Sequence, residues 1–204
     1  MKGKDFFSRK AKSDFFETSY SMTEQLLENE NFDYDKTVLE PACGNGAILK
    51  ILDSKFKFID YYDKYSKYFK NYDFVNEPIK HKYIITNPPF SLWDEFVQKA
   101  KTVATGKFAF LGRLEFLTGI SRFRNNLYSD PEYPLTKVYI FVRKVNLSYT
   151  KDYPSLREDG KYPAGMYHYA WFIFENRGKL VNGWFSPKIK WINNQKYILH
   201  KEDL

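Results

Sequence analysis

The sequence Tyr83-Ile84-Ile85-Thr86-Asn87-Pro88-Pro89-Phe90 joins a short apolar run to a tetrapeptide that cannot continue a strand. The apolar run predicts a buried strand, and neither proline can donate a backbone hydrogen bond to a β-ladder. Both proline carbonyls stay free to accept, Asn87 adds a side-chain carbonyl, and Phe90 adds a flat apolar face. We interpret this cluster as a site that holds a planar molecule by an exocyclic amino group and stacks against its ring.

Apolar and periodic segments on both sides of this stretch alternate between strands and helices. Further strands are expected at 37–40, 56–59, 108–111, 138–142 and 170–174, and helices at 21–29, 47–52, 92–103 and 120–127. This order indicates an α/β fold, with a mostly parallel central sheet, helices on both faces and a late antiparallel strand. Ligands of such sheets bind beyond the carboxyl ends of the strands, where Glu40, Asp60 and Asn87 are expected.

A glycine-containing turn, Glu40-Pro41-Ala42-Cys43-Gly44-Asn45-Gly46, follows the first of these strands. Gly44 and Gly46 let the backbone turn tightly and approach a ligand closely. The turn does not match the dinucleotide pattern G-x-G-x-x-G, because position 49 is leucine, and no Gly-Lys-Ser/Thr follows as in a P-loop. The carboxylate of Glu40 disfavours a phosphate and favours a cation.

Three acids beyond this turn are candidates for cofactor binding. Asp60 ends the next expected strand, at a position where an acid commonly accepts hydrogen bonds from ribose hydroxyls, and Asp63 is a nearby alternative. Asp73 is suited to accept from an adenine amino group, and Phe74 to cover the adenine ring. Each of these residues is also compatible with an ordinary structural role.

The composition narrows the class of protein. The formal net charge of +7 favours contact with polyanions, and an aromatic content of 20% serves the core and offers a few surfaces for stacking bases. We expect a cytoplasmic protein, because neither a run of 18 apolar residues nor an apolar segment behind the basic N-terminus is present. One cysteine and three scattered histidines predict neither an internal disulfide nor a metal site.

Together these motifs resemble the S-adenosylmethionine-dependent amino-methyltransferases, and most closely the phage-type adenine-specific DNA methyltransferases. Residues 16–19, Phe-Glu-Thr-Ser, are similar to their N-terminal motif F/Y-x-T-P, with Ser19 in place of the proline. Residues 40–46 are similar to their glycine loop, and residues 87–90 to their catalytic motif D/N/S-P-P-Y/F. Segments 111–117 and 169–172 also resemble this group, so the likeness spans residues 13–192. It implies the Rossmann-like fold of class I methyltransferases.

The resemblance also implies a reaction: methyl transfer from S-adenosyl-L-methionine to the exocyclic amine of adenine in DNA, without a metal. Thr18 would contact the methionine carboxylate and Glu40 the methionine amino group. The implied cofactor-binding residues are Phe16, Thr18, Glu40, Pro41, Ala42, Gly44, Gly46, Asp60, Asp73, Phe74 and Asn87. The implied catalytic residues are Asn87, Pro88, Pro89 and Phe90.

Too few residues separate the glycine loop from the catalytic motif for an inserted recognition domain. We therefore expect a single methyltransferase domain over residues 1–204, with the target read by loops at 112–134 and 143–168. Basic candidates for nucleic-acid contact are Arg113, Arg122, Arg124, Arg143, Lys144, Lys151, Arg157 and Lys161. The alternatives are a methyltransferase acting on an adenine or guanine amine in RNA, a protein glutamine methyltransferase, and a catalytically idle nucleic-acid-binding protein. The protein is expected to act as a monomer or homodimer.

Overall fold

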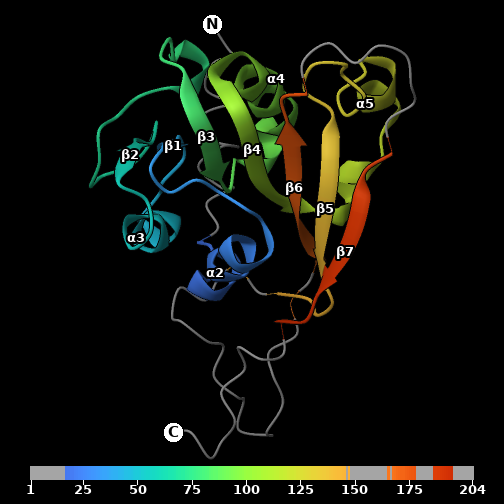
Figure 1. Cartoon of the computed structure of the whole chain (residues 1–204), viewed down its shortest axis with the longest axis horizontal. Helices are drawn as coiled ribbons and strands as arrows, with labels where there is room; N and C mark the ends of the chain where they lie inside the picture. The colour runs from blue at the N-terminus through green and yellow to red at the C-terminus, as the bar shows by residue number, and fades with distance from the viewer. Residues whose placement is uncertain (1–16, 146, 148–164, 166, 178–185, 195–204) are drawn as a thin grey trace, which may run out of the picture.

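The computed structural model describes residues 17–145, 147, 165, 167–177 and 186–194. In this part of the chain seven strands form one sheet in the order β2-β1-β3-β4-β6-β5-β7 (Figure 1). The strands are β1 (Thr37–Glu40), β2 (Phe58–Tyr61), β3 (His81–Thr86), β4 (Ala104–Arg113), β5 (Leu135–Phe141), β6 (Tyr169–Glu175) and β7 (Lys188–Ile192). Neighbouring strands are parallel, except that β6 runs antiparallel to both β4 and β5. The predicted mostly parallel sheet with a late antiparallel strand is confirmed.

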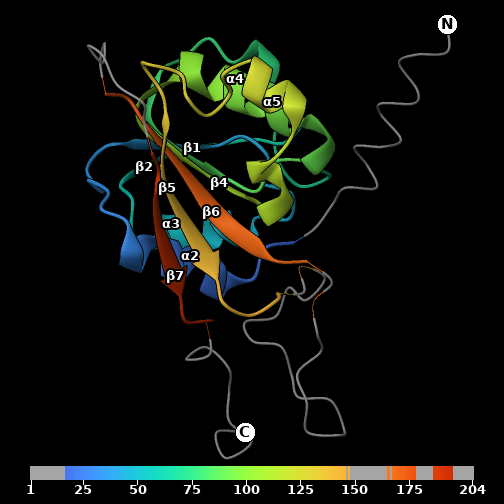
Figure 2. The same cartoon turned by 90° about the vertical axis from the view of Figure 1, so that its right-hand side faces the viewer.

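Helices cover both faces of the sheet. They are α2 (Tyr20–Asn29), α3 (Ala47–Asp53), α4 (Trp93–Val103) and α5 (Ile120–Arg124), with short 3₁₀ helices η1 (Phe74–Asn76), η2 (Phe90–Leu92) and η3 (Leu114–Leu117). The helices α2 and α3 lie on one face, and α4 and α5 lie on the other (Figure 2). The apolar side chains of α4 recur at helical spacing and are buried against the sheet, which explains why this segment is helical.

Several predicted bounds differ from the observed ones, and β4 begins four residues before the predicted strand. Strand β2 lies two residues later than expected, and β7 was not predicted. Helix α5 ends at Arg124 instead of residue 127, and Asn126 beyond it has a left-handed φ of 50°. The other predicted elements are present, most with bounds within a few residues.

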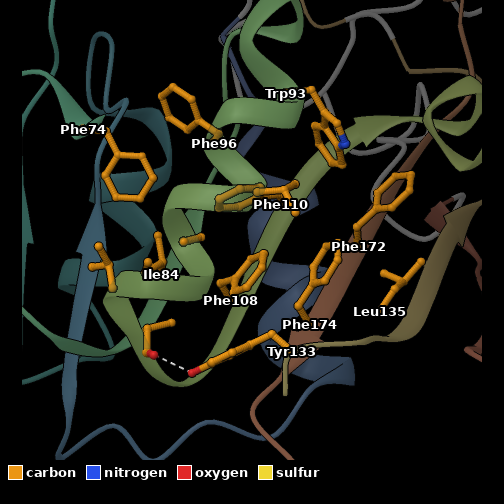
Figure 3. Packing of buried hydrophobic residues seen from close by; sticks show 14 of the residues in the cluster. Phe74, Ile84, Trp93, Phe96, Phe108, Phe110, Tyr133, Leu135, Phe172 and Phe174 are labelled. Atoms are coloured by element: carbon orange, nitrogen blue, oxygen red, sulfur yellow. Dashed lines mark hydrogen bonds between the residues drawn. The ribbon is translucent and has the colours of Figure 1, made fainter. Parts of the chain in front are cut away.

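The core on the α4 face is mainly aromatic (Figure 3). Phe108 and Phe174, from the antiparallel pair β4 and β6, stack with ring centroids 4.5 Å apart and planes at 10°. The Tyr133 hydroxyl donates to the Ala104 carbonyl at 2.5 Å, so its polar atom is satisfied inside the core. Many of the aromatic residues in this chain are therefore structural.

Trp93, the first residue of α4, fixes the start of that helix against the sheet. Its ring packs on Phe110, Phe116 and Phe172, and its Nε1 donates to the Tyr128 hydroxyl at 3.1 Å. Because α4 begins three residues after Phe90, this packing also fixes the chain that leaves the Asn-Pro-Pro-Phe tetrapeptide.

Gly112 in β4 makes room for the Trp93 ring. A Cβ atom at position 112 would lie 2.6 Å and 2.7 Å from two carbons of that ring and 3.0 Å from the ring of Phe116. We therefore expect Gly112→Ala to lower the free energy of unfolding by about 1–3 kcal/mol, the usual cost of overpacking a core. Denaturant titration measures this change, and Gln98→Ala, on the exposed side of α4, is the control and should change stability by less than about 0.5 kcal/mol. A Gly112→Ala protein as stable as the wild type would contradict this packing.

An ion cluster ties the end of α2 to the sheet. The Glu30 carboxylate is buried and accepts hydrogen bonds from Lys107 at 2.5 Å, from Lys137 at 2.9 Å and from the Tyr139 hydroxyl at 2.6 Å. Burial by itself would raise the Glu30 pKa, but these three donors outweigh it and hold the pKa below its ordinary value. The cluster fixes α2, and with it the segment that precedes α2 in the chain.

Candidate active site

The glycine loop follows β1 and leads directly into α3. Gly44 and Gly46 have φ values of 55° and 88°, which disfavour residues with a Cβ atom. The Gly46 N–H donates to the Cys43 carbonyl at 2.7 Å, and a Cβ atom at Gly46 would lie 3.1 Å from the Phe69 ring. The loop therefore needs glycine at both positions, as the sequence predicts.

Glu40 brings a buried carboxylate to this loop. The residue is 1% exposed, and its Oε2 atom has no hydrogen-bond partner among the residues that the structure describes. Burial, and then the nearby charge of Asp63, raise the Glu40 pKa well above its ordinary value, although the backbone N–H of Leu49 opposes the shift. The next two residues are also enclosed, with Pro41 buried and Ala42 half-buried. A buried carboxylate with an unused oxygen is suited to a cationic group.

Asp63, and not Asp60, is the acid held at the glycine loop. The Asp63 carboxylate accepts from the Gly44 N–H at 3.0 Å and from the Tyr65 N–H at 2.6 Å. Asp60 is paired with Leu39 inside the β1–β2 ladder, and its carboxylate lies 3.4 Å from His81 Nδ1. Because β2 lies two residues later than predicted, Asp60 is inside the strand instead of at its end. Of the two acids, only Asp63 has its carboxylate at the glycine loop, and the ribose role predicted for Asp60, with Asp63 as the alternative, stays a prediction.

Asp73 and Phe74 lie at the start of η1 and have structural partners. The Asp73 side chain caps η1 by accepting from the Val75 N–H at 3.3 Å, and it pairs with Lys64 at 2.5 Å. Phe74 is 1% exposed and packs on Phe96 in the core, with centroids 5.0 Å apart. Phe74 therefore has almost no exposed surface in this structure, and the cofactor-binding roles of Phe74 and Asp73 both stay predictions.

The segment before α2 lies beside the glycine loop. The Glu17 carboxylate accepts from the Asn45 side-chain amide at 2.5 Å, a contact that the sequence did not indicate. Thr18 and Ser19 are buried, and the Ser19 and Ser21 hydroxyls are 2.9 Å apart. The N-terminal motif and the glycine loop are thus brought together, while Phe16 lies outside the described residues.

The Asn-Pro-Pro-Phe tetrapeptide lies at the same edge of the sheet as the glycine loop. β3 ends at Thr86 and is the parallel neighbour of β1, so the chain leaves both strands at their carboxyl ends (Figure 1). Pro88 is buried and Asn87 is half-buried. The Pro89 carbonyl accepts from the Leu92 N–H at 2.9 Å, which closes η2 and leads into α4.

Aromatic residues distant in sequence surround Phe90. Its ring centroid lies 5.5 Å from that of Phe116 and 6.0 Å from that of Tyr169, and 4.9 Å from the Arg113 guanidinium carbon. Phe116 and Tyr169 lie in the segments 111–117 and 169–172, which resemble the phage group. No local sequence pattern predicted that either residue would contact Phe90. They come together because β4 pairs with β6.

The basic residues predicted to contact nucleic acid differ in their exposure and in whether they form ion pairs. Arg122 pairs with Asp94 at 2.7 Å and also donates to the Thr118 carbonyl, so its charge is used within the fold. Arg124 is exposed on α5. Arg143 and Lys144 are exposed just beyond the carboxyl end of β5, which runs in the same direction as β3 and β4 and so ends at the edge of the tetrapeptide. The remaining candidates, Lys151, Arg157 and Lys161, lie outside the described residues.

The described part of the chain shows neither a metal-binding cluster nor a membrane-spanning helix. It contains no group of three or more histidine, cysteine, aspartate or glutamate side chains placed to hold a metal ion. It also contains no helix with the length and apolar character needed to cross a bilayer.

This fold is the Rossmann-like fold of class I methyltransferases, as comparison with solved structures shows. No protein-family model matches the chain, and no curated protein matches it by sequence.

Three solved structures with a similar fold are described here by their alignment with this chain. A putative class I S-adenosylmethionine-dependent methyltransferase from Listeria monocytogenes aligns with a TM-score of 0.58 and 10% identity over 87% of this chain and 66% of its own. A modification subunit of a putative type I restriction enzyme from Vibrio vulnificus aligns with a TM-score of 0.58 and 13% identity over 94% of this chain and 51% of its own. The 23S rRNA methyltransferase ErmE aligns with a TM-score of 0.53 and 16% identity over 83% of this chain and 72% of its own. The chain thus spans about half the length of the restriction-enzyme subunit.

Proposed function

We propose that this protein transfers a methyl group from S-adenosyl-L-methionine to the exocyclic amine of adenine in DNA. One observation carries the proposal: the sheet brings a buried carboxylate and a glycine loop, at the end of β1, beside the Asn-Pro-Pro-Phe tetrapeptide at the end of β3. The first pair is suited to a cationic, ribose-containing cofactor, and the second is suited to a planar amine.

The residues of the glycine loop fit the cofactor. The unpartnered Oε2 of Glu40 would accept from the methionine amino group, directly or through water. Asp63, at the Gly44 N–H, would accept from the ribose hydroxyls, and Thr18 would contact the methionine carboxylate. When bound, S-adenosyl-L-methionine supplies an electrophilic methyl group on a positively charged sulfur. The chain's own part is to hold that molecule in one orientation relative to Asn87.

The tetrapeptide fits the amine. The lone pair of an adenine amine is delocalised into the ring, so the amine is a poor nucleophile. The Asn87 side-chain oxygen and the Pro88 carbonyl would each accept one of its hydrogens and draw the nitrogen toward a tetrahedral geometry. The lone pair then points toward the methyl group. As the nitrogen–carbon bond forms, the carbon–sulfur bond breaks with its electron pair left on sulfur, and the methylated amine then loses one proton to solvent. The fixed acceptors and the alignment account for much of the rate. Phe90 would stack the target base, which must leave the duplex to reach this site.

The choice of DNA rests on the resemblance of the motifs to the phage group. The net charge of +7 supports a nucleic acid of either kind. One similar structure is an rRNA methyltransferase and another is a modification subunit of a restriction enzyme, so the fold is compatible with both polymers. A methyltransferase acting on an RNA base is the second candidate, and a catalytically idle nucleic-acid-binding protein is the third.

Label transfer distinguishes these candidates. The protein is incubated with tritiated S-adenosyl-L-methionine and, separately, with duplex DNA, single-stranded DNA, total RNA and protein. We expect label in DNA. Label in RNA alone would replace the proposal with the second candidate, and bound cofactor without label in any polymer would favour the idle protein.

The assignment of the ribose ligand is tested by a matched pair of variants. Asp63→Asn should raise the cofactor dissociation constant about 10–100-fold, because a charge-assisted hydrogen bond contributes about 1.5–3 kcal/mol. Asp60→Asn should change it less than about twofold, since its carboxylate lies at His81 and not at the glycine loop. Calorimetric titration measures both constants, and thermal melts confirm that each variant folds. The reverse order of effects would restore Asp60 as the ribose ligand.

A further inference from the structure

Arg113, the last residue of β4, has its guanidinium among aromatic rings. The guanidinium carbon lies 3.8 Å from the ring centroid of Tyr167 and 4.9 Å from that of Phe90. Arg113 is paired with Tyr169 in the β4–β6 ladder, and the charge of Arg113 opposes the rise that burial causes in the Tyr169 pKa. Both ring distances are within the range of cation–π attraction, so the guanidinium is held in place by stacking.

Among the residues that the structure describes, no carboxylate forms an ion pair with Arg113. Its Nε atom is buried and, within the described ranges, has no hydrogen-bond partner. Arg122 is a useful contrast, because it also lies over an aromatic ring, that of Phe116, but is paired with Asp94. A half-buried guanidinium without a counter-ion is suited to an anionic ligand.

The course of β4 explains how this charge reaches the tetrapeptide. The last pair of the β3–β4 ladder is Thr86 with Phe110. β3 then ends, but β4 continues for three more residues alongside β6, with Arg113 opposite Tyr169. The extra length carries Arg113 past the end of β3 to the ring of Phe90. An unpaired positive charge is therefore fixed next to the residue proposed to stack the target base.

We propose that Arg113, held in place by Tyr167, binds a backbone phosphate of the nucleotide whose base stacks on Phe90. The planar fork of an arginine can bind a phosphate through two hydrogen bonds, and phosphate contacts position a nucleic acid without reading its sequence. A base extruded to Phe90 brings its own phosphates to this edge of the sheet. This inference rests on the proposed function and adds the contact that holds the extruded nucleotide.

The salt dependence of binding separates a phosphate contact from a purely structural role. With S-adenosylhomocysteine present, a short DNA duplex of mixed sequence is titrated at several salt concentrations. For Arg113→Gln we expect binding about tenfold weaker and a slope of log K against log salt smaller by about one unit, the signature of one lost phosphate contact. Arg113→Lys should keep the slope, because it keeps the charge. Tyr167→Leu should also keep the slope but weaken binding, because the charge remains without its support.

The control removes a charge elsewhere. Lys55→Gln alters an exposed lysine between α3 and β2, at the opposite edge of the sheet, and should leave the slope nearly unchanged. Cofactor binding, measured by calorimetry, should be the same in all of these variants. The inference is overturned if Arg113→Gln retains the wild-type slope and affinity while the wild type methylates DNA. If the wild type neither binds nor methylates any polymer, the proposed function itself fails, and the two failures are distinguishable.

Discussion

Replacing Asn87 with alanine is expected to abolish detectable methyl transfer while leaving cofactor binding largely intact. Asn87 follows β3 directly, whereas Glu40 ends β1 and Asp63 follows β2. Its side-chain oxygen is the acceptor that would draw the amine nitrogen into a reactive geometry. Removing one preorganised group of this kind typically lowers kcat about 10²–10³-fold.

The measurement is single-turnover transfer of labelled methyl, with calorimetry of the cofactor on the same sample. Asn87→Asp is the matched control. It keeps an oxygen acceptor at this position and should retain much of the activity that the alanine variant loses. A near wild-type rate for Asn87→Ala would show that the tetrapeptide does not hold the reacting amine.

Replacing Glu40 with glutamine is expected to weaken cofactor binding about 10–100-fold, the effect of losing a charge-assisted hydrogen bond of about 1.5–3 kcal/mol. Glutamine is nearly the same size as glutamate, so the glycine loop should keep its shape. Burial, and then the charge of Asp63, raise the Glu40 pKa well above its ordinary value in the free protein. Binding of a cationic group should therefore release a proton, and wild-type affinity should rise with pH above about 4.5, whereas the affinity of the variant should not.

Stability without cofactor should follow the opposite trend. The folded pKa of Glu40 lies above the ordinary value of 4.5, so the folded protein holds this proton more tightly than the unfolded chain. The contribution of Glu40 to the free energy of unfolding is therefore present below pH 4.5 and is lost as pH rises through the folded pKa. Glu40→Gln should avoid this loss and melt at a higher temperature than the wild type at neutral pH. A variant that binds cofactor as well as the wild type, or that is less stable at neutral pH, would contradict this role.

Part of the fold could be predicted because local signals were strong. Strand β1 has its predicted bounds, since its two apolar residues are buried and a proline and two glycines follow at once. The tetrapeptide after β3 was predictable for a similar reason, because two consecutive prolines end a ladder. The glycine loop and the tetrapeptide both follow central strands, whose apolar residues in the sequence are buried in the structure.

The wrong predictions concern segments in which the burial of a residue cannot be read from its neighbours in the sequence. β2 and β7 are the two edge strands, and most of their residues are exposed, so no contrast between buried and exposed positions marks their bounds. The shift in β2 is the reason that Asp60 lies inside the strand instead of at its end. Phe74 appeared to lie in a polar loop, but its contact with Phe96 in α4 depends on the tertiary fold. The stacking of Arg113 on Tyr167 likewise joins residues that only the β4–β6 pairing brings together.

The central claim is that the Asn-Pro-Pro-Phe tetrapeptide directs a methyl group to the exocyclic amine of adenine in DNA. The most direct test is mass spectrometry of nucleosides from DNA incubated with the protein and S-adenosyl-L-methionine, with Asn87→Ala as the control. We predict N6-methyldeoxyadenosine in the wild-type sample and none in the control. Methylation at a ring carbon or ring nitrogen, or an equal yield of N6-methyldeoxyadenosine from the Asn87→Ala protein, would contradict it.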